Sequence, residues 1–242
     1  MTTITIQNIR NIPYRVAAGP VLCLLLYSSG HAHGIAPLLA SILFATLLYA
    51  AANTQGRHAR PAFMLAGGMF LAMGFGLVPG FSPVHIGSAL VNSGKALAGL
   101  SALAMLPSGW HWNRRCSAIS VLCLVTVPAL AWAIGYVHFA PAAWAVIAWF
   151  ALANLFGTIA EEWFFRPWVQ QPLQRFGVTT SLVLTALLFG LVHFGSGPLF
   201  MALAAVAGLA YAGVFQASGN SIWASVALHL ALNITRTALF GL

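Results

Sequence analysis

Residues 142–166 decide the fold, and they read AAWAVIAWFALANLFGTIAEEWFFR. This long apolar run ends near Glu161 and Glu162, which are the only two acidic residues of the 242-residue chain. About 20 consecutive apolar residues are typical of a helix that crosses a bilayer. Inserting an ionised carboxylate into hydrocarbon costs about 2.5 kcal/mol or more, so packing alone does not explain two of them. The pair is therefore a candidate functional site.

Arg166 lies four residues after Glu162, which is about one helical turn, so these two side chains can pair on one helix face. Glu161 points about 100° away from Glu162 around the same helix, and it can therefore face a cavity while Glu162 is paired. The alternative interpretation is an ion cluster at a helix end, lying at the membrane surface.

The composition of the whole chain indicates a membrane protein. Its residues are 60% hydrophobic and 5% charged, whereas soluble domains carry about 25% charged residues. We therefore predict an all-α, polytopic membrane helix bundle with about eight or nine transmembrane helices, forming a single integral membrane domain over residues 1–242. Nine spans are expected at about 14–29, 35–52, 61–78, 84–106, 117–137, 141–166, 179–194, 199–216 and 222–240.

The net charge of +8 does not indicate nucleic-acid binding, because the basic residues are scattered between apolar segments and form no stripe. They follow the positive-inside rule instead. A cytoplasmic N-terminus places the loops with the following arginines on the cytoplasmic side: Arg57, Arg60, Arg114, Arg115 and Arg175. Arg236 is the exception. An integral membrane protein with a cytoplasmic N-terminus is expected.

Further polar residues interrupt the apolar spans. His193 and His229 are expected inside the seventh and ninth spans, and Asn233 follows His229 by four residues on the same helix face. Polar side chains at membrane depth must face a partner or a cavity. Lys95, in the middle of the fourth span, is expected to snorkel, to be buried against a partner or to indicate that this helix lines a cavity. The favoured interpretation of Lys95 is a lysine near a wet interior that has no chemical role.

Three short motifs on the late helices carry a resemblance to a known family. They are Glu-Glu-x-x-x-Arg at 161–166, Phe-x-x-x-His at 189–193 and His-x-x-x-Asn at 229–233. Together they resemble the CAAX protease and bacteriocin-processing (Abi) family of intramembrane endopeptidases. The similar segment runs from about residue 143 to 233, with a catalytic core expected over about 143–240.

The chemistry of these residues is compatible with peptide hydrolysis, and the family resemblance implies the following catalytic roles for them. Glu161, which we favour over Glu162, is expected to be the base that activates a water, and His193 to hold that water and move its proton. His229 and Asn233 are expected to donate hydrogen bonds to the oxyanion. Glu162 and Arg166 are expected to orient the site. The resemblance also implies that the substrate is a peptide bond near the C-terminus of a membrane-associated or lipidated protein or peptide, and that the protein lies in the bacterial inner membrane.

Two alternatives remain open at this level. Glu161, His193 and His229 also form a competent zinc set, although the His-Glu-x-x-His signature is missing; a cofactor-free mechanism is favoured. The same polar groups can instead line a path in a non-catalytic transporter or immunity protein. Pro167 and Pro172 are expected to break the sixth helix, and His193 is expected about 20 Å from the start of its own helix. A shared site therefore requires that the sixth helix continues past Pro167 or that segment 170–178 dips into the membrane.

Overall fold

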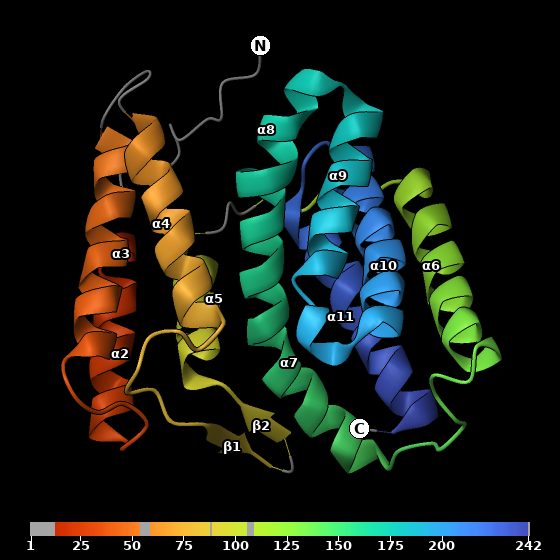
Figure 1. The fold of residues 1–242 in the computed structure, drawn as a ribbon, viewed down its shortest axis with the longest axis horizontal. Helices are drawn as coiled ribbons and strands as arrows, with labels where there is room; N and C mark the ends of the chain where they lie inside the picture. Colours follow the sequence, from red (N-terminus) through yellow and green to blue (C-terminus); the bar gives the residue numbers. More distant parts are fainter. Residues whose placement is uncertain (1–12, 54–58, 88, 106–108, 242) are drawn as a thin grey trace. The chain divides into compact units, whose positions relative to one another are not determined.

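The computed structural model describes residues 13–53, 59–87, 89–105 and 109–241. Helices dominate this part of the chain (Figure 1), which confirms the predicted all-α membrane bundle. Three helical runs among the described residues are long and apolar enough to cross a membrane: Arg114–Ala133, Trp144–Phe176 and Pro198–Ala217. Other apolar helices are shorter, so the predicted number of eight or nine crossings stays a prediction.

The chain divides into two compact units, and α7 contributes to both. Unit 1 comprises residues 1–107 and 155–164, and unit 2 comprises residues 108–154 and 165–242. The prediction of a single integral membrane domain stays a prediction. Arg57, which supports the predicted orientation, lies outside the described residues.

Unit 1 is a helical assembly with an aromatic core. Its helices are α1 (Pro13–Val16), α2 (Ala18–Ser28), α3 (Ala36–Asn53), α4 (Ala59–Gly74), α5 (Ser93–Met105) and the last part of α7 (Trp144–Phe164). Helix α2 packs on α3 and α5, and α4 packs on α3 and α5. The ring of Phe70 lies 4.9 Å from that of Trp163 and 5.8 Å from that of Phe44, measured between centroids. Aromatic pairs at such distances add to the stability that burial provides.

The predicted fourth span, 84–106, is wrong in its first part. A hairpin of β1 (Val84–Ile86) and β2 (Ala89–Val91) occupies this stretch, and α5 begins only at Ser93. Gly87, at the turn, has a φ of 58°, a conformation that favours glycine and tight hairpin turns. The side chain of Asn92 then accepts a hydrogen bond from the backbone N–H of Lys95 at 3.0 Å. This contact caps the first turn of α5 and fixes where the helix starts.

Unit 2 is organised around α10. Its elements are α6 (Arg114–Ala133), the first part of α7, η3 (Phe165–Gln170), α8 (Gln171–Leu173), η4 (Gln174–Phe176), α9 (Val178–Leu191), η5 (Phe194–Ser196), α10 (Pro198–Ala217) and α11 (Ile222–Phe240). Helix α10 packs against α6, α9 and α11. Its approach to α9 is close at Gly190, where an added Cβ would lie 2.6 Å from the carbonyl oxygen of Met201.

Pro167 does not end the sixth helix, contrary to the prediction. The chain continues from α7 into η3, a π-helical segment, and the helical run extends from Trp144 to Phe176. A π-helical turn shifts hydrogen bonding from the fourth to the fifth residue, and such segments are frequent at functional sites. One of the two conditions for a shared site, that the sixth helix continues past Pro167, is therefore met.

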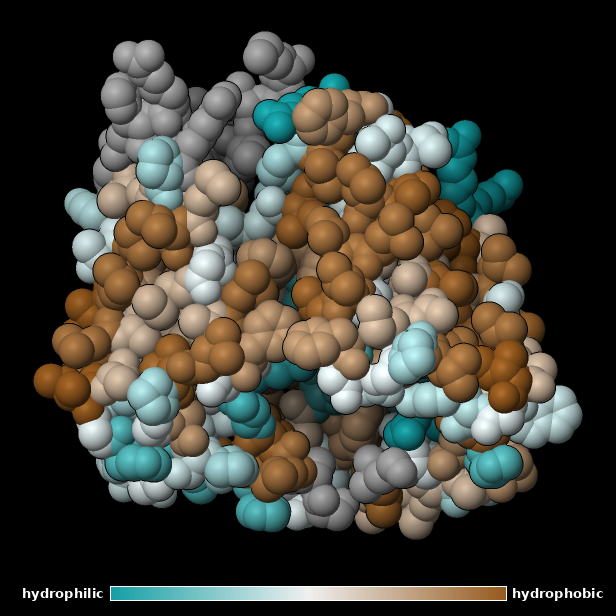
Figure 2. Space-filling model, viewed as in Figure 1, coloured by the Kyte–Doolittle hydropathy of each residue, from teal (hydrophilic) through white to brown (hydrophobic). Residues whose placement is uncertain are grey.

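The outer faces of the helices are suited to lipid. Figure 2 shows apolar side chains over much of the visible surface. On α6, Val121, Leu122 and Val125 are 63%, 67% and 64% exposed. Exposed apolar surface on this scale marks an interaction site in a soluble protein, but it is the expected lipid-facing surface of a membrane helix.

Candidate active site

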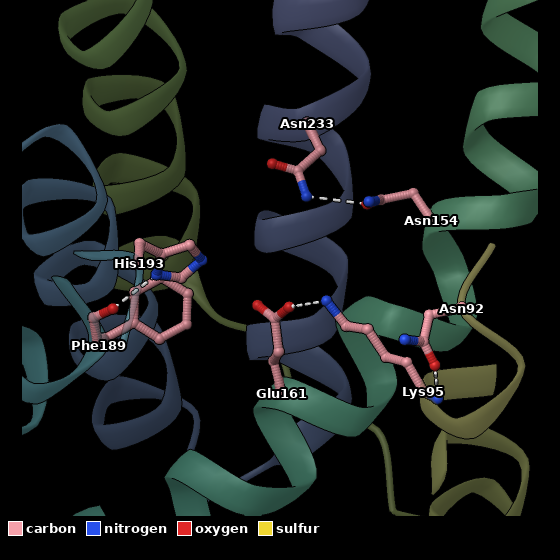
Figure 3. Close-up of polar contacts among 7 residues, drawn as sticks. All are labelled: Asn92, Lys95, Asn154, Glu161, Phe189, His193 and Asn233. Carbon is pink, nitrogen blue, oxygen red and sulfur yellow. Dashed lines mark hydrogen bonds and ion pairs between the residues drawn. The ribbon is translucent and has the colours of Figure 1, made fainter. Parts of the chain in front are cut away.

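The two glutamates lie near the end of α7, in the part that belongs to unit 1. Glu162 is fully buried, whereas the side chain of Glu161 is 21% exposed. Glu161 Oε1 accepts a hydrogen bond from Lys95 Nζ at 2.5 Å, and the two groups form an ion pair (Figure 3). The sequence left open that Lys95 is buried against a partner; the structure pairs it with Glu161 but leaves its side chain 37% exposed.

Arg166 lies in η3 of unit 2, and its side chain is fully buried. Its Nη1 donates to Gln170 Oε1 at 2.5 Å, and Gln170 Nε2 donates to the carbonyl oxygen of Ala212 on α10 at 2.9 Å. The hydroxyl of Ser181 on α9 donates to the backbone carbonyl of Gln170 at 2.8 Å. These bonds fix the π-helical segment to two helices of unit 2. The predicted pairing of Glu162 with Arg166 stays a prediction.

His193 lies just beyond the end of α9, which stops at Leu191, and not inside a helix as predicted. Its Nδ1 is 2.7 Å from the backbone carbonyl oxygen of Phe189 (Figure 3). Because a carbonyl oxygen only accepts, this contact requires the proton on Nδ1. In the neutral ring, Nε2 then carries the lone pair. This is the tautomer that a proton acceptor needs.

His229 lies within α11, as predicted, and is 5% exposed. Its ring stacks on that of Tyr211, with centroids 4.4 Å apart and an interplanar angle of 15°. The ring of Phe189 lies 4.9 Å from the His193 ring and 5.6 Å from the His229 ring. Unit 2 therefore brings the two predicted histidines to one aromatic ring, and the stacked tyrosine orients His229.

Asn233 follows His229 by one turn on α11, as the sequence predicts. Its Nδ2 donates to Oδ1 of Asn154 on α7 at 2.8 Å (Figure 3). Both residues belong to unit 2. Sequence reasoning missed Asn154, although an amide within an otherwise apolar helix is a signal of a polar partner. The contact restricts the orientation of the Asn233 amide.

The predicted site residues are divided between the units. Glu161 and Glu162 belong to unit 1, whereas the following belong to unit 2: Arg166, His193, His229 and Asn233. The structure gives the local geometry of each set. The expected meeting of the acid with the imidazoles therefore stays a prediction. The same holds for the alternative zinc set, because the described residues of neither unit alone gather three side chains suited to a metal ion.

The fold and these polar groups define a helical membrane protein with a candidate catalytic acid, two oriented imidazoles and a fixed amide. Residues 142–235 match the model of the family of type II CAAX prenyl endopeptidase Rce1-like proteins. This segment contains every predicted site residue and confirms the resemblance found in the motifs; it covers less than half of the chain. No curated protein and no solved structure is similar enough to the chain to match it.

Proposed function

We propose that this protein is an intramembrane endopeptidase. It hydrolyses a peptide bond near the C-terminus of a membrane-associated or lipidated protein or peptide. The observation that carries the proposal is the family match over residues 142–235, which includes all three motifs. The apolar helices support a site reached from the membrane.

In the proposed reaction, Glu161 is the general base and removes a proton from a water molecule. The oxygen of that water attacks the scissile carbonyl carbon, and the proton is later delivered to the leaving amine. His193 holds the water and moves its proton. The Nδ1 contact with Phe189 supports this role, because it leaves Nε2 as the acceptor of the neutral ring.

His229 and Asn233 are proposed to stabilise the oxyanion. Both are donors on one face of α11, and each is oriented by a neighbour: Tyr211 stacks on the imidazole, and Asn154 accepts from the amide. Pre-oriented donors contribute most when they need no reorganisation during the reaction, and the loss of one typically lowers the rate about 10²–10³-fold. Glu162 and Arg166 are proposed to hold the end of α7 and η3 in place.

A zinc-dependent form of the same protease is the alternative for the reaction type. In that form Glu161, His193 and His229 would hold the ion, which would polarise the attacking water. Carboxylate oxygen and imidazole nitrogen atoms are common zinc ligands. Metal content of the purified protein decides between the two forms, together with activity before and after 1,10-phenanthroline. The cofactor-free mechanism predicts substoichiometric zinc and unchanged cleavage.

The proposed location is the bacterial inner membrane, with the N-terminus in the cytoplasm. Arg114 and Arg115 at the start of α6, and Arg175 in η4, support this orientation through the positive-inside rule. In this arrangement the loop that contains His138 lies on the opposite side of the membrane.

The test is a cleavage assay with the purified protein in liposomes. Its substrates are a prenylated and an unlipidated version of one peptide, compared at equal concentration. Glu161→Gln and His193→Ala are expected to remove cleavage. His138→Ala is the matched control, because His138 is an exposed histidine in a loop, and this variant is expected to cleave as the wild type does.

Proteolysis retained in both site variants would overturn the proposal. The absence of cleavage by the wild-type protein, with either peptide, would favour a non-catalytic membrane protein in which the polar groups line a path.

A further inference from the structure

Lys95 is the only lysine of the chain, and it pairs with one of the only two acidic residues. It lies on α5, far outside the segment that matches the family model. An ammonium group within an apolar helix carries an insertion cost, so its presence there needs a reason. Its contact with Glu161, the proposed general base, offers one.

The surroundings of Lys95 are shaped to admit its side chain. Gly157 lies one turn before Glu161 on α7, and a Cβ added there would lie 3.1 Å from Lys95 Cε and 3.4 Å from Nζ. Gly99 lies one turn after Lys95 on α5, and a Cβ added there would lie 2.1 Å from the carbonyl oxygen of Phe156. Two glycines therefore let α5 approach this part of α7, and the lysine stem runs over one of them.

The N-terminal cap of α5 fixes the backbone position of Lys95. Asn92 Oδ1 accepts from the backbone N–H of Lys95, and this cap sets the position of the first helical turn (Figure 3). The ammonium then meets Oε1 of Glu161. The α5 cap fixes the Lys95 backbone and Gly157 leaves space for its side chain, so the ammonium can reach one carboxylate oxygen of Glu161.

The ion pair is less buried than the neighbouring carboxylate of Glu162. The Lys95 and Glu161 side chains are 37% and 21% exposed, whereas the neighbouring Glu162 is fully buried. The ion pair engages Oε1 of the Glu161 carboxylate, so it can restrict the rotation of that group.

We propose that Lys95 is a positioning residue for Glu161: its ion pair holds the carboxylate in the orientation in which it acts as the base. The inference rests on the proposed function. It extends the active site to a helix of the N-terminal half, so residues 142–235 alone do not complete the site.

The test begins with Lys95→Met, which keeps the length of the side chain and removes its charge. We expect kcat to fall between about 10- and 100-fold, the range that misplacement of a reacting group produces, with KM within about twofold of the wild type. Gln216→Ala is the control, because Gln216 forms a hydrogen bond in unit 2 that involves no proposed site residue. It is expected to leave kcat unchanged.

A chemical rescue separates positioning from folding. Lys95→Cys is placed in a chain whose three native cysteines, Cys23, Cys116 and Cys123, are replaced by alanine, and it is alkylated with 2-bromoethylamine. The product restores an ammonium at nearly the original length, and it fits the space above Gly157. We expect alkylation to recover at least half of the kcat of the cysteine-free parent that retains Lys95. Treatment of that parent is expected to change nothing.

The ion pair also has a readout that is independent of proteolysis. Because the chain has one lysine, isotope labelling of lysine Nζ gives one side-chain NMR signal. We expect Glu161→Gln to shift this signal and Glu162→Gln to leave it in place.

A Lys95→Met variant with wild-type kcat would overturn the inference while the proposed function stands. So would an alkylated Lys95→Cys protein that is folded and remains slow. Failure of the proposed function is seen separately, in the wild-type arm, where neither peptide is cleaved; the inference then falls with it.

Discussion

The hydrogen bond between Asn154 and Asn233 leads to a prediction that joins local geometry to rate. Asn154→Ala removes the acceptor that lies 2.8 Å from Asn233 Nδ2. Hydrogen bonds between side chains of membrane helices contribute about 0.6 kcal/mol on average and at most about 1.7 kcal/mol. Taking about 1 kcal/mol, the amide keeps its productive orientation about fivefold less often. We therefore expect kcat to fall about fivefold and KM to stay constant.

Direct removal of the proposed donor gives the scale for comparison. Asn233→Ala is expected to lower kcat by about 10²–10³-fold, as for other oxyanion donors. The double variant is expected to be no slower than Asn233→Ala alone, because the proposed effect of Asn154 on the rate passes through the Asn233 amide. Steady-state kinetics of the four proteins in the liposome cleavage assay measure this cycle.

A matched control exists within unit 2. Gln216→Ala removes the acceptor of another bond between side-chain amides, from Gln174 Nε2 at 2.8 Å. It is expected to cost similar stability in thermal unfolding and to leave kcat unchanged. Additive losses from Asn154→Ala and Asn233→Ala would refute the reasoning. Full activity of Asn154→Ala would also refute it.

Two further predictions concern the packing that orients the histidines. Gly190→Ala is expected to destabilise unit 2 by about 1–3 kcal/mol in thermal unfolding. The new Cβ would lie 2.6 Å from the Met201 carbonyl oxygen and 2.8 Å from Ala205 Cβ. Gly195→Ala is the control, because a Cβ added there has no atom within 4 Å. Equal melting temperatures for the two variants would contradict the close approach of α9 and α10. Tyr211→Leu is expected to lower stability by about 0.5–1.5 kcal/mol beyond the lost burial, by removing the ring stacked on His229, whereas Tyr211→Phe keeps the stack. Equal losses of stability in Tyr211→Leu and Tyr211→Phe, measured by thermal unfolding, would show that the hydroxyl, and not the stack, matters.

The helices and their approximate locations were predictable from the sequence. A long apolar run bounded by glycine, proline or arginine forms a helix in a membrane, because a helix satisfies all its backbone hydrogen bonds internally. The predicted ninth span, 222–240, coincides with α11. The hairpin at 84–91 was missed because β-branched apolar residues suit both a strand and a short buried helix. Pro167 was expected to break the sixth helix because proline removes one backbone donor, and a π-helical turn was not considered.

Parts of the candidate site could be predicted for a similar reason. Glu161, Glu162, His193 and His229 are conspicuous against an apolar background, and the positions of His229 and Asn233 follow from helical spacing. The partners Lys95 and Asn154 are distant in sequence from the residues they contact. No helical periodicity connects residues 66 positions apart, as Lys95 and Glu161 are, and only the folded chain pairs them.

The central claim is that the acid on α7 and the imidazole after α9 share one water molecule. Cross-linking of Glu161→Cys with His193→Cys, in a chain without the native cysteines, tests it most directly. A disulfide requires Cα atoms about 4.4–6.8 Å apart, so the pair is treated with a short bismaleimide as well as with an oxidant. We expect efficient cross-linking of positions 161 and 193 and none of 161 with 138. Equal cross-linking of the two pairs in the folded protein, or none of either, would contradict the account.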